Sequence, residues 1–417
     1  MRKLAPIATT AALLTGILTT PAWATAPEAP TNVQVTRVDG KVQVTWEDNG
    51  EANIVRTEDL DTGKVYLERT TQVGETNKVT PPSGFIKSSR LRISVTSRGA
   101  AQEESVPGLS VLFDTQWVNQ PVRKDAELLP DGSVRVQWTQ KAIEDVTPGD
   151  PLDVSAEFIT LVVRGPAAGQ EERIPLPVGT TSYTLPARPG PVRLALDVGN
   201  EWWTYSTPAK LAQVGTNNPA ITVPAIAGYN KALGIQSKVT SGLTIDDLPV
   251  EIQARPSSNR GWRTVGRLMT APGAAHTTQL TSLGASQYRL WVPAVKKSKL
   301  GEFKLAPAAS TSARSSKTFA DVYLAGFDPA TTALGTTTTM RVAAIPTTPM
   351  NVALQQWDGK QWKHVRSIAW DMEHFNFPVK ATRRGTVKFR ILTPVVQTAS
   401  GLWVEPGSSK PFTLTVR

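Results

Sequence analysis

Apolar and polar residues alternate with a period of two through most of this 417-residue chain. Neighbouring side chains of a strand point to opposite faces of a sheet, so this pattern places one face against a core and the other in water. The clearest runs are residues 33–35, 41–46, 90–96, 133–138, 192–198, 250–254 and 386–391. Turn signals such as Asp39-Gly40 and Asp358-Gly359 lie between such runs. The pattern predicts an all-β chain of antiparallel sandwiches.

The chain contains no Cys, so disulfides contribute nothing to its stability. Each folding unit then has to hold itself together by apolar burial, which takes about 80–100 residues. The length of the chain fits about four such units. We therefore expect four tandem β-sandwich modules, at residues 25–115, 116–215, 216–312 and 313–417.

Residues 1–24 have the form of a signal peptide. Arg2 and Lys3 supply a positive start, residues 11–18 are mainly apolar, and Ala22-Trp23-Ala24 has the small–x–small form of a cleavage site. The apolar stretch is too short to span a bilayer, and no later stretch reaches that length. We expect a secreted, extracellular protein, in the medium or at the cell wall, with no transmembrane segment in the mature chain.

Residues 29–215 resemble two fibronectin type III domains. Trp46 and Trp138 end alternating strands of the kind that carry the core Trp of that family, and residues 181–196 follow the order of its later strands. Two features depart from the family pattern: Leu91 and Val192 stand where the family has Tyr, and an insertion occupies residues 139–157. The resemblance implies modules that bind or space, and bacterial domains of this kind often accompany glycan-active enzymes.

The second half contains a different internal repeat at an offset of 100 residues. The matched pairs are Pro249 and Pro349, Ile252 and Val352, Ala254 and Leu354, Trp262 and Trp362, and Val265 and Val365. One residue later in register, Tyr288 matches Phe389 and Leu290 matches Ile391. The two repeats resemble immunoglobulin-like domains of bacterial surface proteins. The polar, Ala- and Ser-rich residues 306–316 between them are expected to form a flexible linker.

Charge divides unevenly between the two halves. Residues 25–215 contain 19 Lys+Arg and 25 Asp+Glu, a balance of −6, whereas residues 216–417 contain 24 and 10, a balance of +14. Basic surfaces attract anionic polymers by steering and counterion release. The candidate ligand-binding basic residues are Lys296, Lys297, Lys299, Arg383, Arg384, Lys388 and Arg390. No motif for specific nucleic-acid recognition accompanies them.

Aromatic residues supply a second kind of candidate. Trp202 and Trp357 are candidates for a carbohydrate platform, because both lie near turns. The four tryptophans that recur at matched module positions, Trp46, Trp138, Trp262 and Trp362, are expected instead to pack between sheets, since their neighbours alternate.

The sequence contains no signature of catalysis. It has no Cys, no nucleophile elbow and no zinc-protease motif. The nearest approach to a metal site is His364, Asp371 and His374, and the acidic residues 144–153 of the insertion leave calcium as an alternative. We assign no catalytic, cofactor-binding or metal-binding residue. An unrecognised hydrolase stays as an alternative that a pocket of clustered ionisable residues would favour.

These observations favour a non-enzymatic exported protein that binds or spaces at the bacterial surface. The expected partners are an anionic cell-wall polymer, a polysaccharide or another surface protein. The alternative is a polysaccharide-binding accessory protein for glycan-active enzymes. The oligomeric state is left open.

Overall fold

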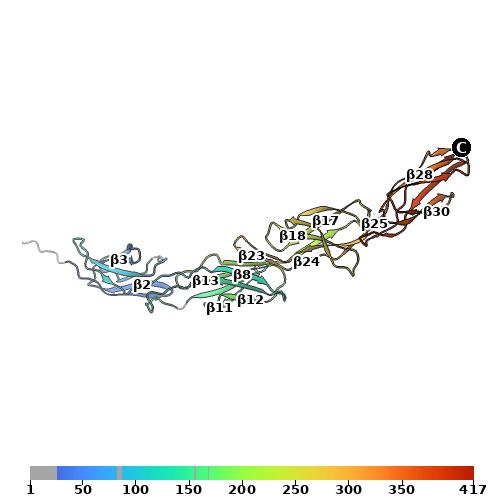
Figure 1. Cartoon of the computed structure of the whole chain (residues 1–417). Helices are drawn as coiled ribbons and strands as arrows, with labels where there is room; N and C mark the ends of the chain where they lie inside the picture. Colours follow the sequence, from blue (N-terminus) through green and yellow to red (C-terminus); the bar gives the residue numbers. More distant parts are fainter. Residues whose placement is uncertain (1–25, 82–86, 155, 168) are drawn as a thin grey trace, which may run out of the picture. The chain divides into compact units, whose positions relative to one another are not determined.

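The computed structural model describes residues 26–81, 87–154, 156–167 and 169–417. Within these ranges every regular element is a β-strand, as the alternation predicts (Figure 1). The signal peptide expected at residues 1–24 lies outside the described residues. The described residues include no helix of the length and apolarity that a membrane crossing needs.

The chain divides into two compact units. The first consists of Met1–Asn119, Lys141–Glu157 and Gly199–Thr204, and the second of Gln120–Gln140, Phe158–Val198 and Tyr205–Arg417. The module bounds expected from the sequence stay a prediction, because several strand pairings within the second unit cross them.

The first unit is a sandwich of two sheets, with strand orders β1-β2-β5 and β4-β3-β6-β7. Its core contains Trp46, Leu91 and Phe113, and it also contains Leu152 from the insertion, whose side chain is fully buried. The insertion therefore supplies part of a core. The strands are β1 (Thr31–Val38), β2 (Lys41–Glu47), β3 (Ala52–Asp59), β4 (Lys64–Thr70), β5 (Lys78–Val79), β6 (Leu91–Arg98) and β7 (Gly108–Leu109).

The second unit begins with a sandwich whose sheets have the orders β12-β9-β8 and β11-β10-β13-β14. Alternate residues of β9, among them Val134, Val136 and Trp138, are buried between these sheets. The strands are β8 (Val122–Leu128), β9 (Val134–Thr139), β10 (Phe158–Arg164), β11 (Glu171–Leu176), β12 (Ser182–Leu185), β13 (Val192–Gly199) and β14 (Ala209–Val214).

Two further sandwiches follow, and their sheets match strand for strand. The orders β15-β17-β20 and β16-β25-β21-β18-β19 in the third module correspond to β26-β28-β31 and β27-β35-β32-β29-β30 in the fourth. The third comprises β15 (Asn217–Thr222), β16 (Ile226–Gly228), β17 (Ala232–Ser241), β18 (Leu248–Arg255), β19 (Arg263–Thr270), β20 (Ala275–Thr281), β21 (Ser286–Val292), β24 (Ala309–Ser310) and β25 (Arg314–Phe319). The fourth comprises β26 (Asp321–Asp328), β27 (Thr331–Thr332), β28 (Thr337–Ile345), β29 (Met350–Trp357), β30 (Trp362–Trp370), β31 (His374–Lys380), β32 (Gly385–Leu392) and β35 (Phe412–Val416).

Each of these two modules also projects a hairpin onto the module before it. The first hairpin is β22 (Val295–Lys299) with β23 (Glu302–Ala306), and β23 pairs in parallel with β14 of the second module. The second is β33 (Val396–Gln397) with β34 (Trp403–Val404), where the Trp403 carbonyl accepts a hydrogen bond from the Ala285 N–H at 2.7 Å. A Cβ atom on Gly284 would lie 2.3 Å from the Leu402 Cβ, so this approach requires glycine.

The expectation of a flexible linker at residues 306–316 is wrong. The strands β24 and β25 occupy much of this range, and both pair with β21. The Ala- and Ser-rich composition reflects short side chains on paired strands, and backbone hydrogen bonds supply the order that the composition does not indicate.

The matched tryptophans are only partly where the alternation predicts them. Trp46 and Trp138 are buried, with 4% and 1% of their surface exposed. Trp262 and Trp362 are half-buried on the outer face of their sheets, so the prediction that they pack between sheets is wrong. In the fourth module the buried tryptophan is Trp370.

A β-bulge explains the error. The pairing of β18 with β19 skips Val265, and the pairing of β29 with β30 skips Val365. One extra residue in a strand inverts which alternate residues face the core. Residues on the far side of each bulge, such as Leu268 and Ile368, pack against the core, whereas Trp262 and Trp362 face outward.

The repeat register also changes inside the module. Ile252 pairs with Leu290 as Leu354 pairs with Ile391, so β18 and β29 match at an offset of 102. Trp262 and Trp362 match at 100, because the stretch from Gln253 to its partner Thr264 is two residues longer than the stretch from Gln355 to its partner His364. A shift of two preserves the alternation, so the sequence pattern could not reveal it.

Replacing Trp138 by Ala is expected to destabilise the second unit by about 3–5 kcal/mol, because a fully buried large side chain is lost. Trp262→Ala should cost only about 1 kcal/mol, since its ring contacts guanidinium groups at the surface. Urea unfolding of both full-length variants measures the two losses. Equal losses would contradict the outward orientation of Trp262.

Candidate functional site

The basic residues of the hairpin β22–β23 have internal carboxylate partners. The Lys296 Nζ lies 2.8 Å from an oxygen of Asp125, and the Lys297 Nζ lies 2.9 Å from an oxygen of Asp247. Lys299 forms an ion pair with Asp246. These ion pairs neutralise much of the charge that the sequence pattern assigned to a ligand.

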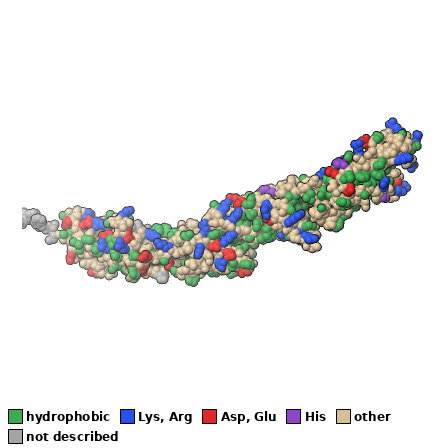
Figure 2. Space-filling model, viewed as in Figure 1, with side chains coloured by type: hydrophobic (Ala, Val, Ile, Leu, Met, Phe, Trp, Pro, Cys, Tyr) green, Lys and Arg blue, Asp and Glu red, His purple; other side chains and the backbone are tan. Residues whose placement is uncertain are grey.

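Arg383, Arg384 and Lys388 are placed differently. The two arginines lie in the turn between β31 and β32, and all three side chains are exposed. The ion pairs recorded after residue 320 in the described part of the chain involve none of the three. Figure 2 shows Lys and Arg side chains at this C-terminal end.

Arg390 and Trp357 both lie beside Trp362 on the outer face of the fourth module. The guanidinium of Arg390 lies 4.7 Å from the centre of the Trp362 ring, and its Nε donates a hydrogen bond of 2.7 Å to the Gln355 amide oxygen. The Trp357 ring lies 5.3 Å from that of Trp362. Phe389 pairs with Gln356 at the end of this ladder, and Lys388 and Trp357 are the adjoining residues of the two strands.

The third module has the same arrangement. The Arg289 guanidinium lies 4.5 Å from the centre of the Trp262 ring, and its Nε donates a hydrogen bond of 2.9 Å to the Gln253 amide oxygen. Arg255 lies 4.4 Å from the same ring centre and donates to Gln287 and to the Ser258 carbonyl. The sequence pattern missed this site, because Arg255 and Arg289 are isolated in the chain and only strand pairing joins them.

Trp202 lies in the first unit, half-buried against its core, with the Arg37 guanidinium 4.6 Å from its ring centre. Its neighbour Trp203 stacks on Trp117 at 4.3 Å between ring centres, with 10° between planes. Trp202 thus belongs to a different unit from the other candidate residues. Its ring is already in contact with a cation, Arg37.

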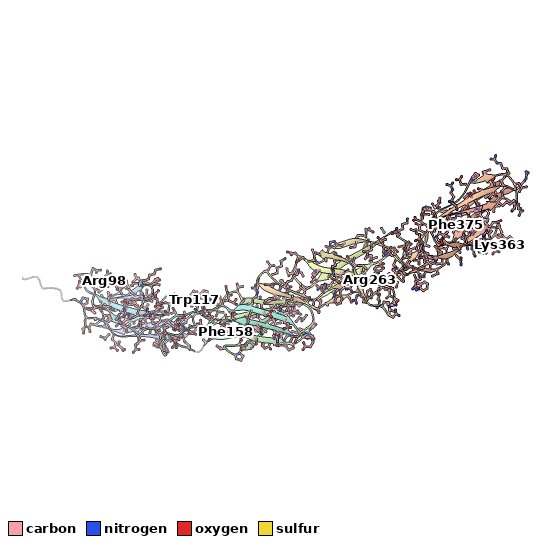
Figure 3. All side chains as sticks on the ribbon, in the orientation of Figure 1. Arg98, Trp117, Phe158, Arg263, Lys363 and Phe375 are labelled. Carbon is pink, nitrogen blue, oxygen red and sulfur yellow. The ribbon has the colours of Figure 1, made fainter. Side chains whose placement is uncertain are left out.

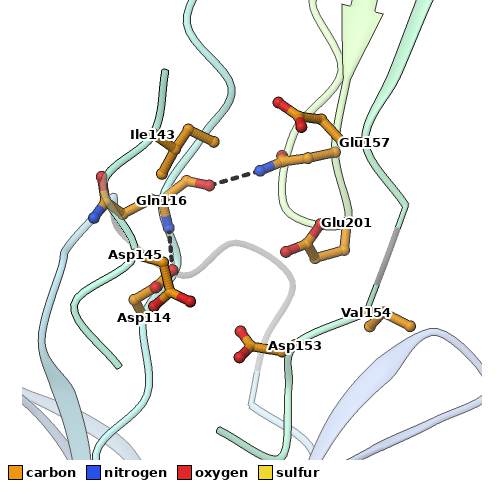
Figure 4. A pocket seen from close by; sticks show the side chains of 9 residues that line it. Asp114, Gln116, Ile143, Asp145, Asp153, Val154, Glu157 and Glu201 are labelled. Atoms are coloured by element: carbon orange, nitrogen blue, oxygen red, sulfur yellow. Dashed lines mark hydrogen bonds between the residues drawn. The ribbon is translucent and has the colours of Figure 1, made fainter. Parts of the chain in front are cut away.

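An acidic pocket lies in the same unit, and the sequence foresaw only part of it. It has a volume of about 370 Å³ and includes Asp145 and Asp153 from the insertion. Figure 4 shows these side chains beside Asp114 and Glu201. The whole lining is Asp114, Gln116, Ile143, Asp145, Asp153, Val154, Glu157, Asn200 and Glu201.

The pocket raises the pKa of three carboxyl groups. Burial is the main cause for Asp114, Asp153 and Glu201. The charge of Asp150 raises the pKa values of Asp153 and Asp114 further. Raised carboxyl pKa values in a pocket are a feature of catalytic sites, so the contacts of these groups decide their role.

Those contacts are mostly with the loop itself. The Asp114 carboxylate accepts from the Gln116 N–H at 2.9 Å, and the Asp153 carboxylate accepts from the Gly149 and Asp150 N–H groups at 2.8 and 3.1 Å. Asp150 accepts from the Leu152 N–H at 2.7 Å, which fixes the residue that enters the core. The carboxylates therefore hold the insertion in place.

The geometry of this acidic cluster is poorly suited to binding a metal ion. Asp114, Asp150 and Asp153 offer oxygens within 4.8 Å of one another, and they are the one such set among the described residues. Calcium takes six to eight oxygens, whereas backbone N–H groups already use several of these. His364, Asp371 and His374 are not brought together in such a set.

Comparisons with known proteins leave the family open. No protein-family model and no curated protein matches the chain. Solved structures similar to it include the FN1–FN3 domains of chicken CNTN1, with 10% identity over 70% of this chain and 99% of that one, at a TM-score of 0.28. A two-domain fibronectin type III segment of chicken tenascin matches with 13% identity over 44% of this chain and 97% of that one, at 0.22.

A third match is the E. coli alpha-2-macroglobulin, with 9% identity over 94% of this chain and 40% of that one, at a TM-score of 0.19. Scores and identities this low carry no argument about function. The all-β sandwich fold follows from the strand pairing of this chain.

Replacing Asp153 by Asn is expected to raise the melting temperature of the first unit slightly at neutral pH, because the amide oxygen can still accept the backbone hydrogen bonds while the charge is removed. A carboxyl whose pKa is raised by folding opposes folding once it ionises, so this penalty is present at neutral pH and disappears as pH falls toward 4. Calorimetry of the full-length protein at both pH values tests this.

Asp61→Asn is the matched control, with the opposite sign. Hydrogen bonds from Ser89 and Arg90 lower the pKa of Asp61 to about 2, so its ionised form stabilises the fold above pH 4 and loses that effect as pH falls toward 2. A melting temperature that falls in both variants at neutral pH would contradict the repulsion assigned to the pocket.

Proposed function

We propose that this protein is an exported, non-enzymatic binding and spacing protein of the bacterial surface or medium, whose basic C-terminal half binds an anionic polymer. The observation that carries the proposal is the placement of charge. The half with a balance of +14 contains the exposed cations Arg383, Arg384 and Lys388, which form no ion pair within the described part of the chain.

The internal pairing of the hairpin lysines sharpens the proposal. Lys296, Lys297 and Lys299 form ion pairs with carboxylates. The proposed binding surface is therefore the exposed cations of the fourth module. Long-range attraction to a polyanion depends on cations that remain available to displace counterions.

A role without catalysis is supported by the contacts in the acidic pocket. Its carboxylates accept hydrogen bonds from the backbone of the insertion, and Asp150 fixes the residue that enters the core. The alternative function, a polysaccharide-binding accessory protein, shares the prediction of polymer binding and differs in the type of polymer.

The test uses the full-length chain, because β14 and β23 join the modules and separate halves would expose a sheet edge. Reversing the charge in Arg383→Glu/Arg384→Glu/Lys388→Glu should weaken retention on an anionic polymer. The slope of log affinity against log salt concentration should fall by about 2–3, since each lost contact removes roughly 0.7–0.9.

The matched control is Lys41→Glu/Lys64→Glu/Lys78→Glu, which changes net charge equally at exposed positions of the first unit. Retention of the control should remain within about two-fold of the native protein. Equal losses in both triple variants would show that only net charge matters and would remove the proposal, as would a native protein that fails to bind at low salt.

A further inference from the structure

The third and fourth modules carry an equivalent cluster on the outer face of the same sheet. We call it the Gln–Arg–Trp triad: Gln253, Arg289 and Trp262 in the third module, and Gln355, Arg390 and Trp362 in the fourth. In both triads Gln and Arg are paired residues on adjacent strands, so the match follows the sheet and not the sequence offset. The residues next to Trp262 and Trp362, Arg263 and Lys363, are labelled in Figure 3.

Each triad orients its guanidinium. The amide oxygen of Gln accepts from Nε, and the guanidinium carbon lies over the indole ring. An oriented guanidinium presents its terminal N–H groups as a fork that matches a carboxylate in a bidentate pair. Among the described residues both arginines contact amide oxygens and aromatic rings, and neither forms an ion pair.

The third-module triad also has a second cation. Arg255 pairs with Gln287 across β18 and β21, and its guanidinium lies 4.4 Å from the centre of the Trp262 ring. In the fourth module Arg390 is the cation over the indole ring, and the exposed Lys388 lies two residues before it on β32. Alternate residues of a strand share a face, so Lys388 adds positive charge to the face that carries Arg390.

In the third module, the repulsion between the charges of Arg255 and Arg289 favours the binding of an anion. Burial lowers the pKa of Arg289, and the neighbouring charge of Arg255 lowers it further. Gln253, which accepts from Arg289, itself donates to the Glu251 carboxylate. Glu251 also accepts from Thr264 and Arg267, and it forms no hydrogen bond with Arg289. An external anion would meet two cations with no internal competitor in direct contact.

We propose that the two triads are repeated subsites for an acidic polysaccharide, each binding a sugar carboxylate at the guanidinium of Arg289 or Arg390. This inference rests on the proposed function and names the polymer class. Half-exposed indole rings and glutamine amides beside the cations suit sugar rings and hydroxyl groups, which favours a glycan over another polyanion. Two subsites on one chain bind a long polymer more tightly than a short one.

The experiment measures binding of the full-length protein to polygalacturonate, which carries a carboxylate on every sugar. Its methyl ester is the matched ligand, with the same backbone and no charge. Arg289→Gln/Arg390→Gln should lower the affinity for polygalacturonate by roughly 10-fold or more, because each substitution removes a charge-assisted hydrogen-bond pair. A trisaccharide of the same sugar should bind with nearly the same affinity whether the protein has one intact subsite or two.

Two further variants separate orientation from charge. Arg289→Lys/Arg390→Lys keeps both charges but loses the forked N–H groups. Its affinity should therefore be nearly as low as that of Arg289→Gln/Arg390→Gln. Arg263→Gln/Lys363→Gln removes two charges at the residues that follow Trp262 and Trp362, on β19 and β30. This variant should change the affinity by less than about two-fold. Circular dichroism and melting temperature of each variant show that the fold is intact.

The outcomes distinguish this inference from the proposed function. If the native protein binds polyanions with a steep salt dependence but the triad variants bind like the Arg263/Lys363 control, the subsites are refuted and the proposed function stands. If Lys fully restores binding, or if single-stranded DNA or dextran sulfate binds more tightly than polygalacturonate, the acidic-glycan assignment is overturned. If the native protein binds no polyanion, the proposed function itself fails.

Discussion

The pairing of β14 with β23 is the constraint on which the second unit depends. It brings Lys304, with 1% of its side chain exposed, to the junction, where its Nζ donates to Glu302 at 2.6 Å and to Gln213 at 2.7 Å. A buried charge is tolerated only with such partners. Gln213 also donates to the Gly242 carbonyl and accepts from the Thr244 N–H, so one network fixes the junction between two modules.

The sequence pattern predicted the fold class well, because alternation reports directly which strand face is buried. It failed at Trp262 and Trp362, where a single unpaired valine inverts the faces. Nothing in the residues Val265 and Val365 distinguishes a bulge from regular strand. The two-residue change in repeat register was invisible for the related reason that alternation is unchanged by an even shift.

The candidate site was predicted where charge is local in sequence and missed where it is local only in space. Arg383 and Arg384 are adjacent in the chain, and they remain exposed. The ion pair of Lys296 with Asp125 joins residues 171 positions apart, so no sequence window contains both. Arg289 gains its indole and amide neighbours through strand pairing alone, and its chemistry therefore emerges only from the sheet.

The hairpins that the third and fourth modules project onto their predecessors bear on how such a chain can evolve. A domain that folds alone can be copied, deleted or moved between genes at its linkers. Here a copy of the third module inserted elsewhere would carry β22 and β23 without β14, and would leave β14 without its neighbour. Gene duplication is therefore expected to have acted on stretches that keep each hairpin with the surface that receives it, so that inheritance follows the junctions rather than the modules.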